Sequence, residues 1–228
     1  DFNEVAPGVF QLKPEIPNNT NERANIKPGD PKLKDINGDG KVTAEDQTVI
    51  GHGLPIHTGG FTNNFEWKGF DLSIFFQWSY GNDVINYNRA RLESLDGRHL
   101  NQLATVKNHW TPRTTLADNT VVEGNYTNYL WAVNRGLSNI HTSREVEDAS
   151  FLRLKNVQLG YRFPNKVLKR LHLSSLRMYI SAQNLYTWTS YTGYDPEVST
   201  RNSAMTRGFD YSAYPKAKTF TFGVELAL

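Results

Sequence analysis

The chain has 228 residues, and its 25 Lys and Arg against 23 Asp and Glu leave a formal net charge of +2. So small a charge excludes bulk electrostatic attraction to nucleic acid or to an anionic membrane surface. The absence of cysteine excludes a disulfide scaffold, a Cys-ligated zinc site and thiol catalysis. The sequence contains no run of about 18 apolar residues, so it predicts no transmembrane helix. The chain starts at Asp1 without Met or an apolar leader, as expected of a processed chain or a piece of a longer one.

The first 34 residues carry five prolines, which remove backbone donors and predict mostly loop, with a short extended piece around residues 9–11. Residues 35–46 read Asp-Ile-Asn-Gly-Asp-Gly-Lys-Val-Thr-Ala-Glu-Asp. Oxygen ligands at loop positions 1, 3, 5 and 12 with glycine at 6 are typical of an EF-hand or dockerin-like calcium loop. The predicted ligands are the side chains of Asp35, Asn37 and Asp39, the backbone carbonyl of Lys41, Thr43 directly or through a water, and the carboxylate of Asp46.

This loop has a second interpretation. Asn-Gly and Asp-Gly pairs favour turns by themselves, so an ion-free turn stays open as the alternative to a structural Ca²⁺ site. Thr43 and Asp46 also form a capping-box pattern, which predicts a short helix that runs through Ile50 and ends at Gly51.

From Gly59 onward, apolar and polar side chains alternate with a period of two, which predicts strands with one apolar and one polar face. In residues 70–80 every even position is apolar or aromatic, and Phe75 is the one apolar residue among the odd positions. Lys68-Gly69 predicts a two-residue hairpin turn. In the third strand Arg153 and Lys155 fall on the apolar parity, so that end is expected at headgroup level or in water. The predicted strands are about 61–67, 69–80, 150–163, 175–187 and 217–228.

The connections between these strands alternate between short and long, as in a membrane barrel with tight turns on one side and loops on the other. Strands of 9–11 residues suit a tilted crossing of the hydrocarbon. The predicted fold class is therefore all-β: an antiparallel transmembrane β-barrel segment with long extracellular loops. Residues 1–58 are expected to form an extracellular loop region, and residues 59–228 the strands and their loops. A large soluble β-sandwich with the same alternation is the alternative.

Motifs for catalysis are missing from the sequence. The six histidines show no H-x-H or H-E-x-x-H spacing, and there is no G-x-S-x-G or phosphate-binding glycine loop. Acid pairs such as Glu145 and Glu147 have nothing that places them across a sugar. We therefore expect no enzyme.

Several blocks of sequence resemble one family over nearly the whole chain. They are Pro28-Gly29-Asp30, residues 59–63 and 68–72, Asn108-His109-Trp110-Thr111-Pro112, residues 149–157 and 183–187, Tyr191 to Glu197, Tyr214-Pro215, and residues 220–223. In this order they resemble the C-terminal part of SusC/RagA-family TonB-dependent outer-membrane transporters of Bacteroidetes. Residues 1–27 match least, and Leu228 stands where an aromatic residue is commoner.

The resemblance implies about five C-terminal strands of a plugged barrel of ~22 strands in the bacterial outer membrane. It implies import of oligosaccharides or peptides and a SusD-like surface lipoprotein as the lid. The other implied partners are TonB, which acts through a plug that lies outside these residues, the remainder of the barrel, and outer-membrane lipid. A secreted, calcium-stabilised module that binds glycans or proteins is the alternative function. The substrate-binding residues are unknown from the sequence.

Overall fold

The computed structural model describes residues 1–6, 9–19, 25–95, 101–133, 141–198, 200 and 207–228. The chain divides into two compact units. Unit 1 comprises Asp1–Ile50 and Asn88–Thr142, and unit 2 comprises Gly51–Tyr87 and Ser143–Leu228. Each unit is described by itself.

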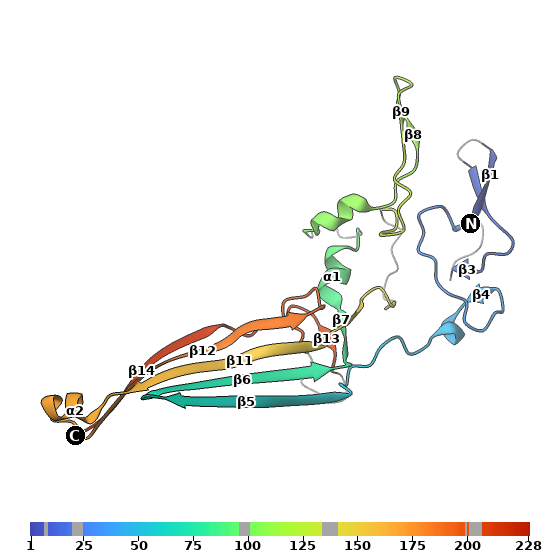
Figure 1. Ribbon diagram of the computed structural model, residues 1–228. Helices are drawn as coiled ribbons and strands as arrows, with labels where there is room; N and C mark the ends of the chain where they lie inside the picture. Colours follow the sequence, from blue (N-terminus) through green and yellow to red (C-terminus); the bar gives the residue numbers. More distant parts are fainter. Residues whose placement is uncertain (7–8, 20–24, 96–100, 134–140, 199, 201–206) are drawn as a thin grey trace. The chain divides into compact units, whose positions relative to one another are not determined.

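Unit 2 is built around one antiparallel five-stranded sheet, in which the neighbours follow chain order (Figure 1). All five predicted strands are present; two extend beyond the predicted ends and three are shorter by one to three residues. They are β5 (His57–Trp67), β6 (Phe70–Tyr80), β11 (Phe151–Arg162), β12 (Ser175–Thr189) and β14 (Thr219–Ala227). The up-and-down order confirms the antiparallel barrel-wall topology expected from the sequence, and the barrel is not closed within this chain.

The two ends of the sheet differ as the connection lengths predict. At one end, named here the turn end, Lys68 and Gly69 adopt φ of 47° and 90° and join β5 to β6 as the expected two-residue hairpin. The helix α2 (Asn165–Leu171) and the C-terminus lie at this end too (Figure 1). The opposite end, the loop end, carries the connections 81–150 and 190–218.

A β-bulge overturns the expected placement of Arg153 and Lys155. Leu154 pairs with Phe76, whereas Asn156 pairs with Phe75, so Lys155 is an extra residue opposite β6. One extra residue reverses the alternation. Arg153 therefore shares a face with its partner Gln77, opposite to the face of Val157, and need not reach headgroups or water on the apolar side.

A second, small sheet forms at the loop end from β7 (Asp83–Asn86), β10 (Val146–Asp148) and β13 (Phe209–Asp210). The sequence does not predict this sheet because its strands are too short to show a period. Its buried cluster is Val84, Ala149 and Tyr191, and the Tyr191 hydroxyl donates a hydrogen bond of 2.7 Å to Asp210. Burial and this bond raise the pKa of Tyr191 well above its usual range, so the phenol stays protonated as a donor.

Unit 1 contains short elements joined by long connections. They are the hairpin β1 (Phe2–Ala6) and β2 (Val9–Leu12), the parallel pair β3 (Asn18–Asn19) and β4 (Lys41–Val42), η2 (Ala44–Asp46), η3 (Ala104–Asn108), and the hairpin β8 (Thr114–Thr115) and β9 (Val121–Val122). The helix α1 (Tyr87–Leu92) begins where the chain re-enters this unit. The region of residues 1–34 that was expected to be mostly loop thus contains a hairpin. Trp110 packs on Gly29, where a Cβ would lie 2.6 Å from the ring.

The capping box of Thr43 and Asp46 is present, but it starts a single 3-10 turn over Ala44–Asp46. The helix expected through Ile50 is wrong, since Gln47 already has extended backbone angles. Within the described residues, no helix has the length and apolar character needed to span a membrane.

Candidate functional site

The five-stranded sheet has an outer face, defined by Leu72, Ile74 and Phe76, whose apolar side chains are exposed on several strands. Along β14, Phe220, Phe222 and Leu226 are 68%, 66% and 60% exposed. Cross-strand pairing aligns these rows, for example Leu72 beside Leu159 and Ile180 beside Phe222. A soluble protein would bury such a continuous apolar surface. The exposure matches a wall that faces lipid, as the alternation predicted.

Aromatic side chains gather at both ends of the outer face. At the turn end the Phe70 and Tyr161 rings lie 4.6 Å apart, and Tyr161 meets Phe163 edge-on at 5.0 Å. At the loop end Tyr186 packs edge-on against Trp188 at 4.8 Å. Barrels in membranes carry such aromatic girdles at both interfaces. The two girdles mark where the hydrocarbon would begin and end.

The inner face is polar and is tied together by an ion pair that crosses β11. Arg177 on β12 donates two hydrogen bonds to Asp71 on β6, at 3.0 and 2.6 Å, and a third of 3.0 Å to Glu225 on β14. The bridge passes over Gly160, where an added Cβ would lie 2.6 Å from the Asp71 carboxylate. Glycine at this position therefore lets the salt bridge span three strands.

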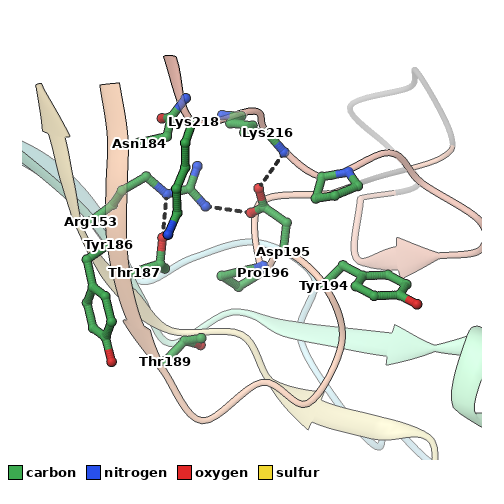
Figure 2. Close-up of a pocket in the computed structure, with 11 residues that line it drawn as sticks. Arg153, Asn184, Tyr186, Thr187, Thr189, Tyr194, Asp195, Pro196, Lys216 and Lys218 are labelled. Carbon is green, nitrogen blue, oxygen red and sulfur yellow. Dashed lines mark hydrogen bonds and ion pairs between the residues drawn. The ribbon is translucent and has the colours of Figure 1, made fainter. Parts of the chain in front are cut away.

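The second inner-face cluster lies at the loop end and is centred on Arg153 (Figure 2). Arg153 is 2% exposed, and each guanidinium nitrogen has a partner: Nε donates to Thr187 at 2.9 Å, Nη1 to Glu197 at 2.9 Å and Nη2 to Asp195 at 2.5 Å. Lys216 also forms an ion pair with Glu197. A buried charge is tolerated only when it is paired and hydrogen-bonded, and Arg153 meets that condition.

Asp195 holds the loop after β12 to this arginine. Its carboxylate also accepts backbone hydrogen bonds of 2.9 Å from Glu197 and 3.1 Å from Lys216. Burial opposes ionisation, but these amide donors and Arg153 together lower the pKa of Asp195 below its usual value. Sequence reasoning missed this cluster. The available signal was two cations on an apolar parity, which indicates a bulge as well as an exposed strand end.

A hollow of about 290 Å³ opens beside Arg153 between β12 and the segment that leads into β14 (Figure 2). Its lining includes Arg153, Asn184, Thr187, Tyr194, Lys216 and Lys218. Tyr194 is 81% exposed, whereas Tyr191 three residues earlier is 5% exposed, so the aromatic residues of this loop divide between packing and exposure.

The predicted calcium loop is folded by its own hydrogen bonds. Asp35 accepts from the amides of Gly38 and Gly40 at 2.7 and 2.8 Å, and Asp46 accepts from the amides of Ile36 and Thr43 at 2.8 and 2.7 Å. The hydrogen bonds from Thr43 and Ile36 lower the pKa of Asp46. The Asn37 side-chain oxygen accepts a 2.9 Å hydrogen bond from the Asp39 amide, and the Asp39 carboxylate accepts one of 2.8 Å from the Lys41 amide.

Two features of this loop bear on whether it binds a metal ion: its glycine conformations and the chemistry of its donor atoms. Gly38 and Gly40 have φ of 80° and 82°, a conformation that needs glycine. In the described part of the chain, no three His, Cys, Asp or Glu side chains gather as a metal-binding group. The predicted metal ligands in the loop are oxygens, as Ca²⁺ requires. Some of them are amide and backbone oxygens, which do not belong to His, Cys, Asp or Glu side chains.

The residues that could suggest an enzyme have structural partners. Glu147 accepts hydrogen bonds from Asn86 and from the hydroxyl and amide of Thr192. His57 accepts a 3.1 Å hydrogen bond from the Trp78 indole and stacks on Tyr80. His99 lies outside the described residues.

The chain is similar to known receptors over most of its length. It is 36% identical over 206 residues to TonB-dependent receptor P3 of Formosa agariphila, covering 87% of this chain and 19% of the receptor. It is 28% identical to TonB-dependent receptor SusC of Bacteroides thetaiotaomicron, covering 89% of this chain and 18% of SusC. The chain thus spans about a fifth of the length of these relatives. No family model matches it.

Solved structures give the same result. The RagAB peptide transporter matches with a TM-score of 0.68 at 28% identity, covering 89% of this chain and 22% of that chain. The RagAB peptide importer in its closed-closed state matches with a TM-score of 0.64 at 29% identity, covering 87% of this chain and 21% of that chain. These relatives are receptors and transporters, in agreement with the expectation of no enzyme. From its strand order, its exposed apolar face and these relatives, the chain belongs to the SusC/RagA family of TonB-dependent receptors, proteins of the bacterial outer membrane.

Proposed function

We propose that the full-length protein imports oligosaccharides or peptides across the outer membrane, energised by TonB and capped by a SusD-like surface lipoprotein. The residues described here form part of the barrel wall in this proposal, with the turn end periplasmic and the loop end extracellular. The observation that carries it is the outer face of the five-stranded sheet, which is apolar and exposed between two aromatic girdles. The relatives named as TonB-dependent receptors and as a peptide importer support it. A secreted module surrounded by water would bury such an apolar face.

The test uses the full-length protein in cells. The protein is expected to fractionate with outer membranes, to need detergent for extraction, and to shift in electrophoretic mobility on heating, as folded barrels do. Deleting its gene should abolish growth on one class of oligosaccharide or peptide and leave growth on the free monomers intact. Recovery of the protein in buffer without detergent would contradict the barrel assignment, and normal growth on every such cargo would contradict import.

We also propose that residues 35–46 bind Ca²⁺ as a structural ion. The ligands would be the side chains of Asp35, Asn37, Asp39 and Asp46, with Lys41 through its carbonyl and Thr43 directly or through a water. The ion would neutralise the carboxylates that the turn brings into one loop. The oxygen donors and the glycine turns support this reading.

Calorimetric titration of calcium into chelator-treated protein tests the calcium proposal. Wild-type protein and Glu45→Ala, a change at an exposed acid of the same loop that is not a predicted ligand, should release binding heat. Asp39→Ala and Asp46→Asn should lose that heat. Absence of heat in the wild type, with unchanged thermal unfolding, would favour the ion-free turn.

A further inference from the structure

The hollow beside Arg153 has more cationic than anionic groups around it. Arg153, Lys216 and Lys218 line it, and Lys155 at the bulge interacts electrostatically with Glu197 and Lys216. The carboxylates that face these cations are Asp195 and Glu197. Both are already engaged, Asp195 by Arg153 and two backbone amides, and Glu197 by Arg153 and Lys216. An excess of positive charge is left in the hollow.

Among the cations that line the hollow, Lys218 is the one without an ion pair in the described chain. Within the described residues its side chain makes no hydrogen bond or ion pair, although it lines the hollow and has three N–H donors. Asn184 supplies the complementary group. Its Nδ2 donates a 2.9 Å hydrogen bond to the Ala217 carbonyl, which fixes the amide orientation, and its Oδ1 is buried without a partner in the described chain.

The hollow opens on the inner side of the sheet. Thr187 and Arg153 are paired residues on the inner face, whereas Tyr186, which also borders the hollow, points to the outer face with its partner Leu154. Figure 2 shows Tyr186 directed away from Arg153, Thr187 and Lys218. A ligand held by Lys218 would therefore come from the substrate path and not from the lipid.

We propose that this hollow binds an acidic sugar unit of the cargo. Lys218 would hold the carboxylate or sulfate, and Asn184 Oδ1 would accept a hydrogen bond from a sugar hydroxyl. Arg153, Asp195 and Glu197 would keep the wall of the hollow in place without taking part in the contact. The inference rests on the proposed import function, because it names the chemical class of the cargo.

Calorimetry on the detergent-purified full-length protein tests this inference, with trigalacturonate and inorganic sulfate as acidic probes and maltotriose as the neutral one. The wild type should bind the acidic probes and not maltotriose. Lys218→Gln should weaken acidic binding by about tenfold, since a hydrogen bond to a charged group is removed. Lys169→Gln, a charge change at an exposed position of α2, should bind like the wild type. Equal binding by the Lys218 and Lys169 variants, or absence of acidic binding in the wild type, would overturn the site.

Two further measurements separate the possible reasons for failure. Adding phosphatidic acid to the micelles should leave sulfate binding unchanged. Competition that depends on Lys218 would assign the site to a lipid headgroup and overturn the cargo assignment. Failure of the import proposal shows in fractionation and growth, whereas failure of this inference shows in titration of a protein that fractionates correctly with the outer membrane.

Discussion

At the scale of single residues, two arginines on the inner face of this wall form ion pairs with distant segments. Arg153 reaches the loop after β12 and Arg177 reaches β6 and β14, so each arginine connects segments that are distant in sequence. Arginine suits this task because its planar guanidinium presents several donors in fixed directions. Removing one partner of such a pair leaves an uncompensated buried charge.

Asp195→Asn should loosen residues 190–198. The change leaves Arg153 without its most buried counter-charge, at a cost of about 3–5 kcal/mol for breaking a buried pair. Limited proteolysis should show faster cleavage in this segment, while Asp118→Asn, an exposed aspartate in unit 1, should behave like the wild type. Equal cleavage of the three proteins would show that the ion pair does not hold the loop.

Lowering the pH should also loosen residues 190–198 in the wild-type protein. The pKa of Asp195 is lowered from its usual 3.8, so its stabilisation is complete above pH 3.8 and is lost as the pH falls through the lower folded-state value. Protection of this segment should therefore be constant from neutral pH down to about 4 and decline below it. The Asp195→Asn protein should lack this acid-dependent step.

Gly160→Val should separate Arg177 from Asp71. The new side chain would occupy the space over which the ion pair passes, and overpacking of this kind costs about 1–3 kcal/mol. Unfolding in urea, followed by the heat-dependent mobility shift, should show lower stability. Thr221→Val, of similar shape on the same face, is the control and should be near neutral. A Gly160→Val protein as stable as the wild type would mean that the bridge can move aside without cost.

At the scale of elements, the bulge at Lys155 decides which face receives Arg153. A regular strand would place Arg153 with Val157 and Leu159 on the outer face. The extra residue shifts the first part of β11 by one position relative to β6, so the two parts of one strand follow opposite parities. The bulge therefore keeps the outer face apolar along the whole strand.

Deleting Lys155 should leave Arg153 on the inner face and the barrel assembled. Leu154 would then directly precede Asn156, so the strand would alternate regularly and keep Leu154 opposite Phe76 and Arg153 opposite Gln77. Leu154→Arg is the contrasting change, because an Arg or Lys facing lipid costs from ~0–1 kcal/mol near the interface to about 2–4 kcal/mol at the midplane. The folded fraction in outer membranes is the measurement, and a deletion variant that assembles as poorly as Leu154→Arg would show that the bulge itself is required.

At the scale of the whole molecule, the sheet cannot be complete by itself. In the described chain, β5 and β14 each pair on one side only. A membrane offers no water to satisfy the free edges, so a spanning sheet must close into a barrel. The residues described here therefore need further strands along both edges.

Deleting residues 219–227 from the full-length protein should abolish assembly, because it removes β14 and leaves the edge of β12 unpaired. Removal of Leu228 alone is the matched control. This residue is 92% exposed and contributes a carbonyl contact to Ser174 at 2.8 Å, so its loss should reduce the folded fraction only slightly. Stable barrels from the protein that lacks residues 219–227 would contradict the pairing of β12 with β14.

The sequence by itself determined the strands of the wall and which of their faces is apolar. The period of two in residues 70–80, the Lys68-Gly69 turn and the alternation in residues 219–228 are local properties, and local backbone geometry translates them directly into strands. The family resemblance also followed from the sequence. The oxygen pattern of residues 35–46 predicted a folded turn, and its calcium remains a prediction.

Only the tertiary structure decided the placement of Arg153 and the small sheet of β7, β10 and β13. The direction of Arg153 depends on how β11 registers against β6 and β12, and the partners that stabilise it follow more than 30 residues later. The strands of the small sheet have two to four residues, too few for a period. The inner-face hollow follows from the same non-local pairing, because Asn184 and Lys218 are neighbours only once β14 begins beside β12.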